Sequence, residues 1–387
     1  MSNCTKQVLQ QTFRDESIGR RGVFGFFYCV IASLASLNVL IGSLEASPWI
    51  AIDTEADSLH AYPEKVCLIQ ISHAGGDELI DPLAKLDLNP LWVALQKRLL
   101  VFHGADYDLR MLRRGYGFIP NLVFDTMIAA RLLGELQFGL SHLVEKFLGV
   151  QLEKGPQKMN WALRPLSERM EVYARNDTRH LRNLSNLLTD QLIAKGRLGW
   201  HQETCARLIR DCARPDVVDL EVHWRVKGTD RLERRAQAMV RELFYWREQE
   251  AIAANLPPYF TMSHELMTRV AEAADAGKDF ESLLPTRYSS ARRKGVENAI
   301  SRALALPRSG WPIKRWQAGS SPSFTEQQRF EELKAIRDSV ASEQGIDPTL
   351  IASKAMLSQL AQKGEESESG LLPWQAGLLL DTRSKGV

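Results

Sequence analysis

Two carboxylates stand at the end of one apolar stretch of the chain. Residues 49–52 carry apolar or small side chains and lead directly into Asp53, Thr54 and Glu55. In a β-strand successive side chains point to opposite faces, so Asp53 and Glu55 share one face. Neighbouring carboxylates repel each other and are costly to bury, and a divalent cation with oxygen ligands offsets both effects. The alternative is a strand that simply ends in a solvated turn. A metal site is therefore indicated only if further acidic residues lie close to Asp53 and Glu55.

Three further residues of suitable chemistry follow. Asp108 lies just beyond an apolar strand predicted at 99–102, early in the next helix. Functional groups in open α/β sheets gather at the carboxyl ends of strands. Asp106 competes for this role, although helix N-capping is its simpler interpretation. Tyr173 and Asp177 are spaced i and i+4 in a predicted helix and therefore share one face, where a tyrosine hydroxyl beside a carboxylate can hold a water molecule.

The elements that must position these residues follow from the apolar pattern. Strands are predicted at 49–55, 66–72, 78–80, 99–102 and 122–124, and helices at 106–114, 126–133 and 232–254. A hairpin followed by alternating strands and helices predicts a mixed α/β sheet flanked by helices. Strand patterns fade after residue 192, which predicts helical modules for the second half of the chain.

In combination, the motifs Asp53-x-Glu55, His103-x4-Asp108 and Tyr173-x3-Asp177 resemble those of the DEDD exonucleases of the tyrosine subtype, and among them the ribonuclease D family. The flanking segments that strengthen the resemblance are Leu68-Ile69-Gln70-Ile71, Asp81-Pro82-Leu83, Phe124-Asp125-Thr126 and Arg164-Pro165-Leu166. Further on, Trp246-Arg247-Glu248 and Asn255-Leu256-Pro257 are similar to the helicase-and-RNase-D C-terminal (HRDC) domain. The segment Ser353-Lys354-Ala355-Met356-Leu357 resembles a second, more divergent copy.

The resemblance implies an α/β ribonuclease H-like exonuclease domain, a mixed sheet flanked by helices, followed by two all-α helical HRDC-like domains. The expected boundaries are 1–30 for an N-terminal extension of unknown role, 31–200 for the exonuclease domain, 218–306 for the first HRDC domain, 307–322 for a linker and 323–387 for the second, divergent HRDC-like domain.

The resemblance also implies a chemistry. It makes Asp53, Glu55, Asp108 and Asp177 ligands of two divalent ions, Mg²⁺ or Mn²⁺, and gives Tyr173 the role of orienting the attacking water. Two such ions activate a water and stabilise the leaving oxygen of a phosphodiester. The expected reaction is 3′–5′ hydrolysis of RNA that releases nucleoside 5′-monophosphates. The expected substrate is an RNA with a single-stranded 3′ end, a tRNA precursor above all, and no obligate protein partner is indicated.

Basic residues indicate where nucleic acid could bind. Residues 287–315 contain eight basic residues and one acid, with aromatic residues between them, a composition that suits a phosphate backbone. We expect Arg292, Arg293 and Lys294 to contact nucleic acid, and likewise Lys154 and Lys158 in the loop before Trp161. A solvated helix face is the alternative. The tryptophans Trp161, Trp224, Trp246 and Trp374 are expected in the core.

Composition and cysteine spacing indicate the cellular compartment of the chain. Its 387 residues are 44% hydrophobic and 25% charged with a net charge of +2, which is ordinary for a globular protein. Five cysteines without a Cys-x-x-Cys spacing argue against a disulfide framework or a zinc site and favour the cytoplasm. The apolar run Val23 to Leu44 leaves a membrane anchor as the less favoured alternative, because its leucines follow the i, i+3, i+4 spacing of an amphipathic helix.

The sequence is compatible with two other functions. A 3′–5′ DNA exonuclease of repair type would use the same five residues, because DNA and RNA present the same phosphodiester. A catalytically idle nucleic-acid-binding scaffold is the third hypothesis. The intact set Asp53, Glu55, Asp108, Tyr173 and Asp177 argues against it.

Overall fold

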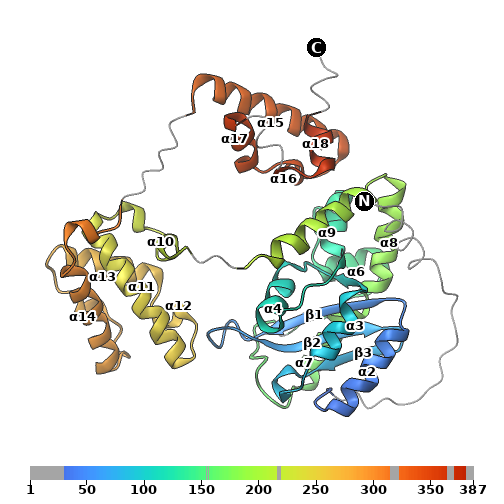
Figure 1. Cartoon of the computed structure of the whole chain (residues 1–387), viewed down its shortest axis with the longest axis horizontal. Helices are drawn as coiled ribbons and strands as arrows, with labels where there is room; N and C mark the ends of the chain where they lie inside the picture. Colours follow the sequence, from blue (N-terminus) through green and yellow to red (C-terminus); the bar gives the residue numbers. More distant parts are fainter. Residues whose placement is uncertain are drawn as a thin grey trace. The chain divides into compact units, whose positions relative to one another are not determined.

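The computed structural model describes residues 30–153, 155, 157–215, 219–313, 322–363 and 370–380 (Figure 1). The contacts within the chain divide it into two compact units. The first unit holds the described residues up to Ala56, Val66–Arg214 and those from Pro322 onward, and the second holds Asp57–Lys65 and the described residues from Pro215 to 313. Of the N-terminal extension predicted at 1–30, all but Val30 lie outside the described residues.

One mixed five-stranded sheet forms the centre of the first unit. Its strands are β1 (Ile50–Ala56), β2 (Val66–His73), β3 (Gly76–Ile80), β4 (Leu99–Phe102) and β5 (Leu122–Asp125), in the order β3-β2-β1-β4-β5. The first three strands pair antiparallel, whereas β1, β4 and β5 run parallel. The predicted strand positions are confirmed, as is the mixed sheet that begins with a hairpin.

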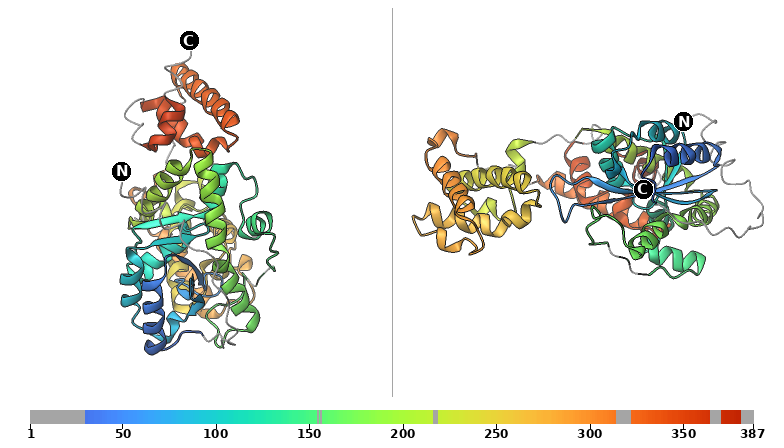
Figure 2. Two further views of the ribbon diagram at one scale, coloured as in Figure 1. Left: turned by 90° about the vertical axis from the view of Figure 1, so that its right-hand side faces the viewer. Right: turned by 90° about the horizontal axis from the view of Figure 1, so that it is seen from below.

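Helices cover both faces of this sheet, as Figure 2 shows. One face carries α2 (Leu34–Ala46), α3 (Asn89–Gln96) and α4 (Asp106–Tyr116); the other carries α5 (Thr126–Leu133), α6 (Leu140–Leu148), α7 (Glu168–Arg179) and α8 (Leu181–Ala194), and α9 (Leu198–Ala213) packs against β5.

The side chains of β1 alternate between the two cores. Ile50 and Ile52 are buried among α2, α3 and α4, whereas Ala51 is buried in the core on the opposite face. By this alternation, Asp53 and Glu55 lie on the same face as Ala51, and Thr54 lies on the face of Ile52.

The helix α2 accounts for the second half of the apolar run at 23–44. Its N-cap is Ser33, and it buries Leu37, Leu40 and Leu44 against the sheet. This burial confirms the prediction of an amphipathic helix, while residues 23–29 lie outside the described residues. Among the described helices, none combines the length and apolarity needed to cross a membrane.

The C-terminal helices pack on the exonuclease domain within the first unit. They are α15 (Phe324–Gln344), α16 (Pro348–Ile351), α17 (Lys354–Lys363) and α18 (Pro373–Leu379). Trp374 of α18 stacks on Trp200 of α9 with ring centroids 4.8 Å apart. The guanidinium of Arg197 donates to the carbonyl oxygens of Leu132 and Gln344 at 2.7 and 2.5 Å. A shared apolar core and these polar contacts therefore make the C-terminal module part of the catalytic unit.

The second unit is helical. Its helices are α10 (Leu220–His223), α11 (Arg234–Ala254), α12 (Pro258–Thr261), α13 (His264–Asp275) and α14 (Ser290–Leu304), with 3₁₀ turns at Thr229–Arg231, Glu281–Leu283 and Arg308–Gly310. The long helix α11 ends at Ala254 with Asn255 as its C-cap, and two prolines follow at 257 and 258, as predicted. Its core includes Trp224 and Trp246. Because Trp161 and Trp374 are buried as well, the predicted core positions of all four tryptophans are confirmed.

Candidate active site

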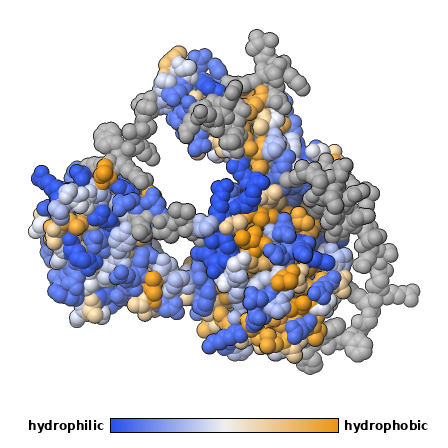
Figure 3. All heavy atoms as spheres, in the orientation of Figure 1, coloured by the Kyte–Doolittle hydropathy of each residue, from blue (hydrophilic) through white to orange (hydrophobic). Residues whose placement is uncertain are grey.

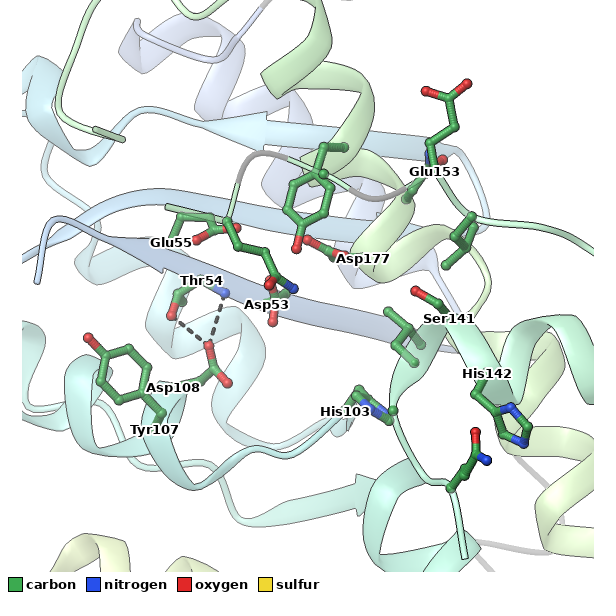
Figure 4. A pocket seen from close by; sticks show the side chains of 18 residues that line it. Asp53, Thr54, Glu55, His103, Tyr107, Asp108, Ser141, His142, Glu153 and Asp177 are labelled. Atoms are coloured by element: carbon green, nitrogen blue, oxygen red, sulfur yellow. Dashed lines mark hydrogen bonds between the residues drawn. The ribbon is translucent and has the colours of Figure 1, made fainter. Parts of the chain in front are cut away.

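The five residues singled out by the motifs line one cleft of about 940 Å³ (Figure 4). Asp53 and Glu55 come from β1, Asp108 from the first turn of α4, and Tyr173 and Asp177 from α7. The helix α7 packs across β1, β2 and β3 on the face to which Asp53 and Glu55 point. The alternation along β1 and the i, i+4 spacing along α7 therefore converge on one place, as the motifs predict.

Three carboxylates form the centre of the cleft. Asp53, Glu55 and Asp177 each contribute an oxygen atom, and these oxygens lie within 4.8 Å of one another. Carboxylate oxygens at such separations are the donor set that hard divalent cations such as Mg²⁺ and Mn²⁺ prefer. The residues present thus fit the divalent-metal chemistry of a DEDD exonuclease.

The fourth carboxylate, Asp108, is held on the opposite face of β1. Its Oδ1 accepts hydrogen bonds from the hydroxyl and the amide of Thr54 at 2.6 and 3.0 Å. Asp108 lines the same cleft, although it is not one of the three carboxylates that lie within 4.8 Å of one another.

The electrostatics of the cleft favour a cation. Burial is the largest cause that raises the pKa values of these acids, and the neighbouring carboxylates raise them further. The pKa of Asp53 is well above its ordinary value, with contributions from Asp108, Asp177 and Glu55. Burial, Asp177 and Asp108 raise the pKa of Glu55 to about 8. Without a counter-charge, these acids therefore resist ionising together.

Tyr173 is held beside the carboxylates by the loop that precedes α7. Burial and the charge of Asp177 raise the pKa of the Tyr173 phenol, and Gln157 and Asp177 line the same cleft as its hydroxyl. Gly155 lies against the phenol ring, where a Cβ atom would come within 1.5 Å of Tyr173 Cδ2. The hydroxyl therefore stays protonated at neutral pH and is fixed at the edge of the carboxylate cluster.

A hydrogen-bond network around Asp125 shapes the turn that leads to Asp108. The Asp125 carboxylate accepts hydrogen bonds from four backbone amides, those of Gly104, Ala105, Met127 and Ile128, at 2.8–3.1 Å. Asp125 is the N-cap of α5, and its bonds to the amides of Gly104 and Ala105 extend that role to the turn before α4. His103 Nδ1 lies 2.9 Å from Thr126 Oγ1, a contact that stabilises the same turn.

One capping prediction is wrong. The N-cap of α4 is Ala105, and Asp106 is the first helical residue. The Asp106 carboxylate pairs with Arg110 one turn further on, at 3.0 Å, instead of accepting a bond from a free amide. Asp125 supplies the hydrogen bonds for this turn from another strand, so a cap within α4 is not needed.

Several residues that line the cleft were not found from the sequence. They are Tyr107, Gln137, Leu140, Ser141, His142, Leu152, Glu153, Gln157 and Asn176. Ser141 and His142 lie in the first turn of α6, and Figure 4 shows both beside the cleft. Tyr107 and Asn176 are adjacent in sequence to Asp108 and Asp177, and this adjacency is the signal by which the sequence could have indicated them.

The predicted nucleic-acid contacts have different surroundings. Lys154 lies outside the described residues, and Lys158 is exposed in the loop before Trp161. Arg292 pairs with Glu250 at 3.0 Å, and Lys294 pairs with Glu297 at 2.6 Å. Arg293 donates to the carbonyl oxygen of Pro285 at 2.8 Å. The role of these residues in binding nucleic acid stays a prediction.

Comparison with known proteins agrees with the fold and the cleft. A family model described as a 3′-5′ exonuclease matches residues 28–193, and an HRDC domain model matches residues 326–373. The HRDC match falls on the module that we expected to be the more divergent copy, and the assignment of the first helical module stays a prediction. The fold and the carboxylate cleft thus define a 3′–5′ exonuclease with a C-terminal HRDC domain.

The relatives identify the family. The chain is 32% identical over 359 residues to ribonuclease D of Gluconacetobacter diazotrophicus, with 89% of each chain covered, and 30% identical over 360 residues to ribonuclease D of Granulibacter bethesdensis. Its fold is similar to that of Escherichia coli RNase D, with a TM-score of 0.73 and 25% identity over 93% of this chain and 98% of the other. The chain belongs to the ribonuclease D family, and it is a 3′–5′ exoribonuclease.

Proposed function

We propose that this exoribonuclease trims the single-stranded 3′ ends of structured RNAs, tRNA precursors among them, and releases nucleoside 5′-monophosphates. The observation that carries the proposal is the cluster of Asp53, Glu55 and Asp177 beside the Tyr173 hydroxyl. The solved relative from Escherichia coli is described as an exoribonuclease involved in structured RNA processing, which supports this substrate class.

The proposed ligands of two Mg²⁺ or Mn²⁺ ions are Asp53, Glu55, Asp108 and Asp177. When bound, the two ions would activate the attacking water and stabilise the leaving 3′ oxygen. Asp53 is the proposed shared ligand, as the resemblance to the family implies, and it lies in the cluster with Glu55 and Asp177. The Thr54 hydroxyl keeps Asp108 turned toward β1.

Tyr173 has a separate role in the proposal. Its protonated hydroxyl lies beside the Asp177 carboxylate and can accept a hydrogen bond from a water molecule, so it can fix the direction of attack without exchanging a proton. The close contact between Gly155 and the phenol ring restricts the orientation of that hydroxyl.

The proposed location is the cytoplasm. Cys67, Cys205 and Cys212, the cysteines of the described ranges, are buried and form no disulfide with one another, which supports a reducing compartment. The basic residues proposed to contact the RNA are Lys158, Arg292, Arg293 and Lys294. Lys154 is proposed as well, from its position in the sequence alone.

Hydrolysis of a tRNA transcript with a 3′ extension tests this proposal. We expect mononucleotides to be released in Mg²⁺ or Mn²⁺ and no release with a chelator. Competition between the tailed tRNA and a single-stranded DNA at equal concentration tests the substrate class. Preferential hydrolysis of the DNA would overturn the RNA assignment, and release that persists in the chelator would overturn the metal-dependent mechanism.

A further inference from the structure

Three arginines in the second unit converge on one short stretch of backbone. Arg225 donates to the carbonyl oxygen of Ile313 at 3.0 Å, and Arg241 donates to that of Gly310 at 2.9 Å. Arg234 donates to the carbonyl oxygens of Pro312 and Trp311, at 2.9 and 3.2 Å. Four consecutive residues span at most about 13 Å, so the three guanidinium groups are close neighbours.

A fourth guanidinium lies at the same place. Arg308 is exposed, and its guanidinium carbon lies 5.9 Å from the centre of the Trp311 ring. We refer to Arg225, Arg234, Arg241 and Arg308 together as the arginine cluster. The α11 helix supplies two of its members, while the other two follow α10 and α14, so three separate segments present their charges around one loop.

The arginines of the cluster do not pair directly with acids, although Glu221 and Glu242 lie near Tyr245, as Arg241 does. Within the described ranges, none of the four forms an ion pair, in contrast to other arginines of the same unit. Arg235 pairs with Asp275 at 2.5 Å, and Arg302 pairs with Glu242 at 3.0 Å. Carbonyl oxygens satisfy hydrogen bonds but carry no net charge, so four positive charges remain close together and repel one another. An anion would remove this repulsion.

The chemistry of the cluster fits phosphates. A guanidinium presents five N–H donors in a planar fork, and the bonds to carbonyl oxygens use only part of that fork. Phosphate oxygens accept paired bonds from such forks. The face of this module visible in Figure 3 is mostly hydrophilic, which suits a polyanion better than an apolar protein surface.

The basic surface that the sequence predicts on α14, Arg292 to Lys294, has fewer unpaired charges than the arginine cluster. Arg292 and Lys294 each pair with a glutamate, so an incoming phosphate must compete with a carboxylate already in place. The arginine cluster has no such competitor among the described residues. Of the two basic surfaces on this unit, the cluster therefore gains more from binding a phosphate backbone.

We propose that the arginine cluster binds the phosphate backbone of the folded part of the RNA whose 3′ end is hydrolysed. This inference rests on the proposed function, because it takes RNA as the substrate. It adds a surface that recognises the RNA body through charge and shape, independently of the sequence of its bases.

The test measures binding of the full-length chain to a stem-loop RNA with a 3′ tail, in EDTA so that no hydrolysis occurs. The double variant Arg234→Gln with Arg241→Gln should bind about tenfold more weakly at low salt. The slope of log affinity against log salt should flatten by about 1.5, because two phosphate contacts are lost. Hydrolysis of a short unstructured RNA in Mg²⁺ should keep its rate, since such an RNA has no folded body to bind.

Matched variants distinguish the loss of positive charge from a disturbance of the fold. Arg234→Lys with Arg241→Lys keeps the charges and loses the fork, so it should restore the salt slope of the wild type and only part of its affinity if the cluster binds phosphate. Arg308→Gln, which removes an exposed charge without a backbone hydrogen bond, should weaken binding by about threefold. Arg292→Gln with Lys294→Gln is the matched control and should change affinity less than the cluster variant does.

Three results would overturn the inference. They are an unchanged affinity in the Arg234/Arg241 glutamine variant, a lysine variant whose salt slope is as flat as that of the glutamine variant, and a larger loss in the Arg292/Lys294 control. If the wild-type chain binds the stem-loop through the cluster but hydrolyses no RNA in Mg²⁺, the proposed function fails while this inference stands.

Discussion

Asp108 accepts two hydrogen bonds from Thr54, the residue that separates the two acids of β1. The Thr54 hydroxyl and amide lie 2.6 and 3.0 Å from Asp108 Oδ1. Thr54 points to the face of β1 on which Ile52 lies, and Asp53 points to the face covered by α7. One face of the strand therefore presents carboxylates to the cleft, while the other face holds Asp108 through Thr54. Thr54 therefore links the first and second acidic motifs directly.

Loss of the Thr54 hydroxyl should weaken metal binding. Thr54→Val removes the shorter of the two bonds to Asp108, and loss of a hydrogen bond that orients a metal ligand commonly lowers metal affinity by about tenfold or more. We expect the Mg²⁺ concentration for half-maximal hydrolysis to rise by about tenfold, with the rate at saturating Mg²⁺ changed much less. Thr189→Val, which removes a buried hydroxyl on α8, is the control. An unchanged Mg²⁺ titration for Thr54→Val would contradict this role.

The Tyr173 hydroxyl should act on the rate of the chemical step. Tyr173→Phe keeps the ring against Gly155 and removes only the hydroxyl, which lines the cleft together with Asp177 and Gln157. We expect kcat to fall by about 100-fold with little change in KM, since the loss of water orientation affects the transition state. Steady-state kinetics on a tailed RNA measure both constants. Tyr107→Phe, at a tyrosine that also lines the cleft, should retain kcat, and an equal loss in both variants would argue against a special role for Tyr173.

A methyl group at Gly155 should reproduce part of that effect. Its Cβ would lie 1.5 and 2.0 Å from Cδ2 and Cε2 of Tyr173, so either the loop or the ring must move. We expect Gly155→Ala to lower kcat by about tenfold or more while the thermal unfolding midpoint changes little. Gly139→Ala is a matched control, because Gly139 lines the same cleft and no atom lies within 4 Å of its added Cβ. If both variants keep full kcat, the contact does not restrict Tyr173.

The positions of the acids follow from periodicities that the sequence displays. Strand alternation places Asp53 and Glu55 on one face, and helical spacing places Tyr173 above Asp177, and both relationships hold in the structure. The buried run at Leu99–Phe102 likewise predicts a strand that leads toward Asp108. These inferences succeed because each depends on residues that are close in sequence.

Contacts between distant segments could not be predicted in this way. The bond between Thr54 and Asp108 joins residues 54 positions apart, and its partners are ordinary in type. Asp106 has the composition of an N-cap, but Asp125 supplies the hydrogen bonds of that turn from another strand. The arginine cluster could not be predicted from the sequence either. Its members Arg225, Arg234 and Arg241 donate to carbonyl oxygens 69 to 88 residues further along the chain.

His201 should make the stability of the fold depend on pH. Burial lowers the pKa of His201 to about 4, and its Nε2 lies 3.1 Å from the carbonyl oxygen of Asp125. In the unfolded chain this histidine takes up a proton near pH 6.5, whereas the folded chain does so only near pH 4. The free energy of unfolding should therefore fall as the pH decreases through this window, by on the order of 3 kcal/mol.

A variant that cannot titrate isolates this effect. His201→Gln keeps a side-chain donor for the Asp125 carbonyl oxygen and loses the protonation. Urea unfolding of both proteins in EDTA at pH 7 and pH 4.5 gives the two differences in free energy. The variant should lose clearly less stability than the wild type between these pH values. Equal losses would show that His201 does not titrate in this window.

Hydrolysis of a 3′-tailed tRNA by Asp53→Asn and Asp177→Asn in Mg²⁺ tests whether the carboxylate cluster is the catalytic site. We expect both substitutions to abolish the release of nucleoside 5′-monophosphates. We also expect both proteins to unfold at a temperature at least as high as the wild type in EDTA, because each substitution removes one charge from a repelling cluster. Release at the wild-type rate by either folded variant would contradict the assignment of this carboxylate cluster as the catalytic site.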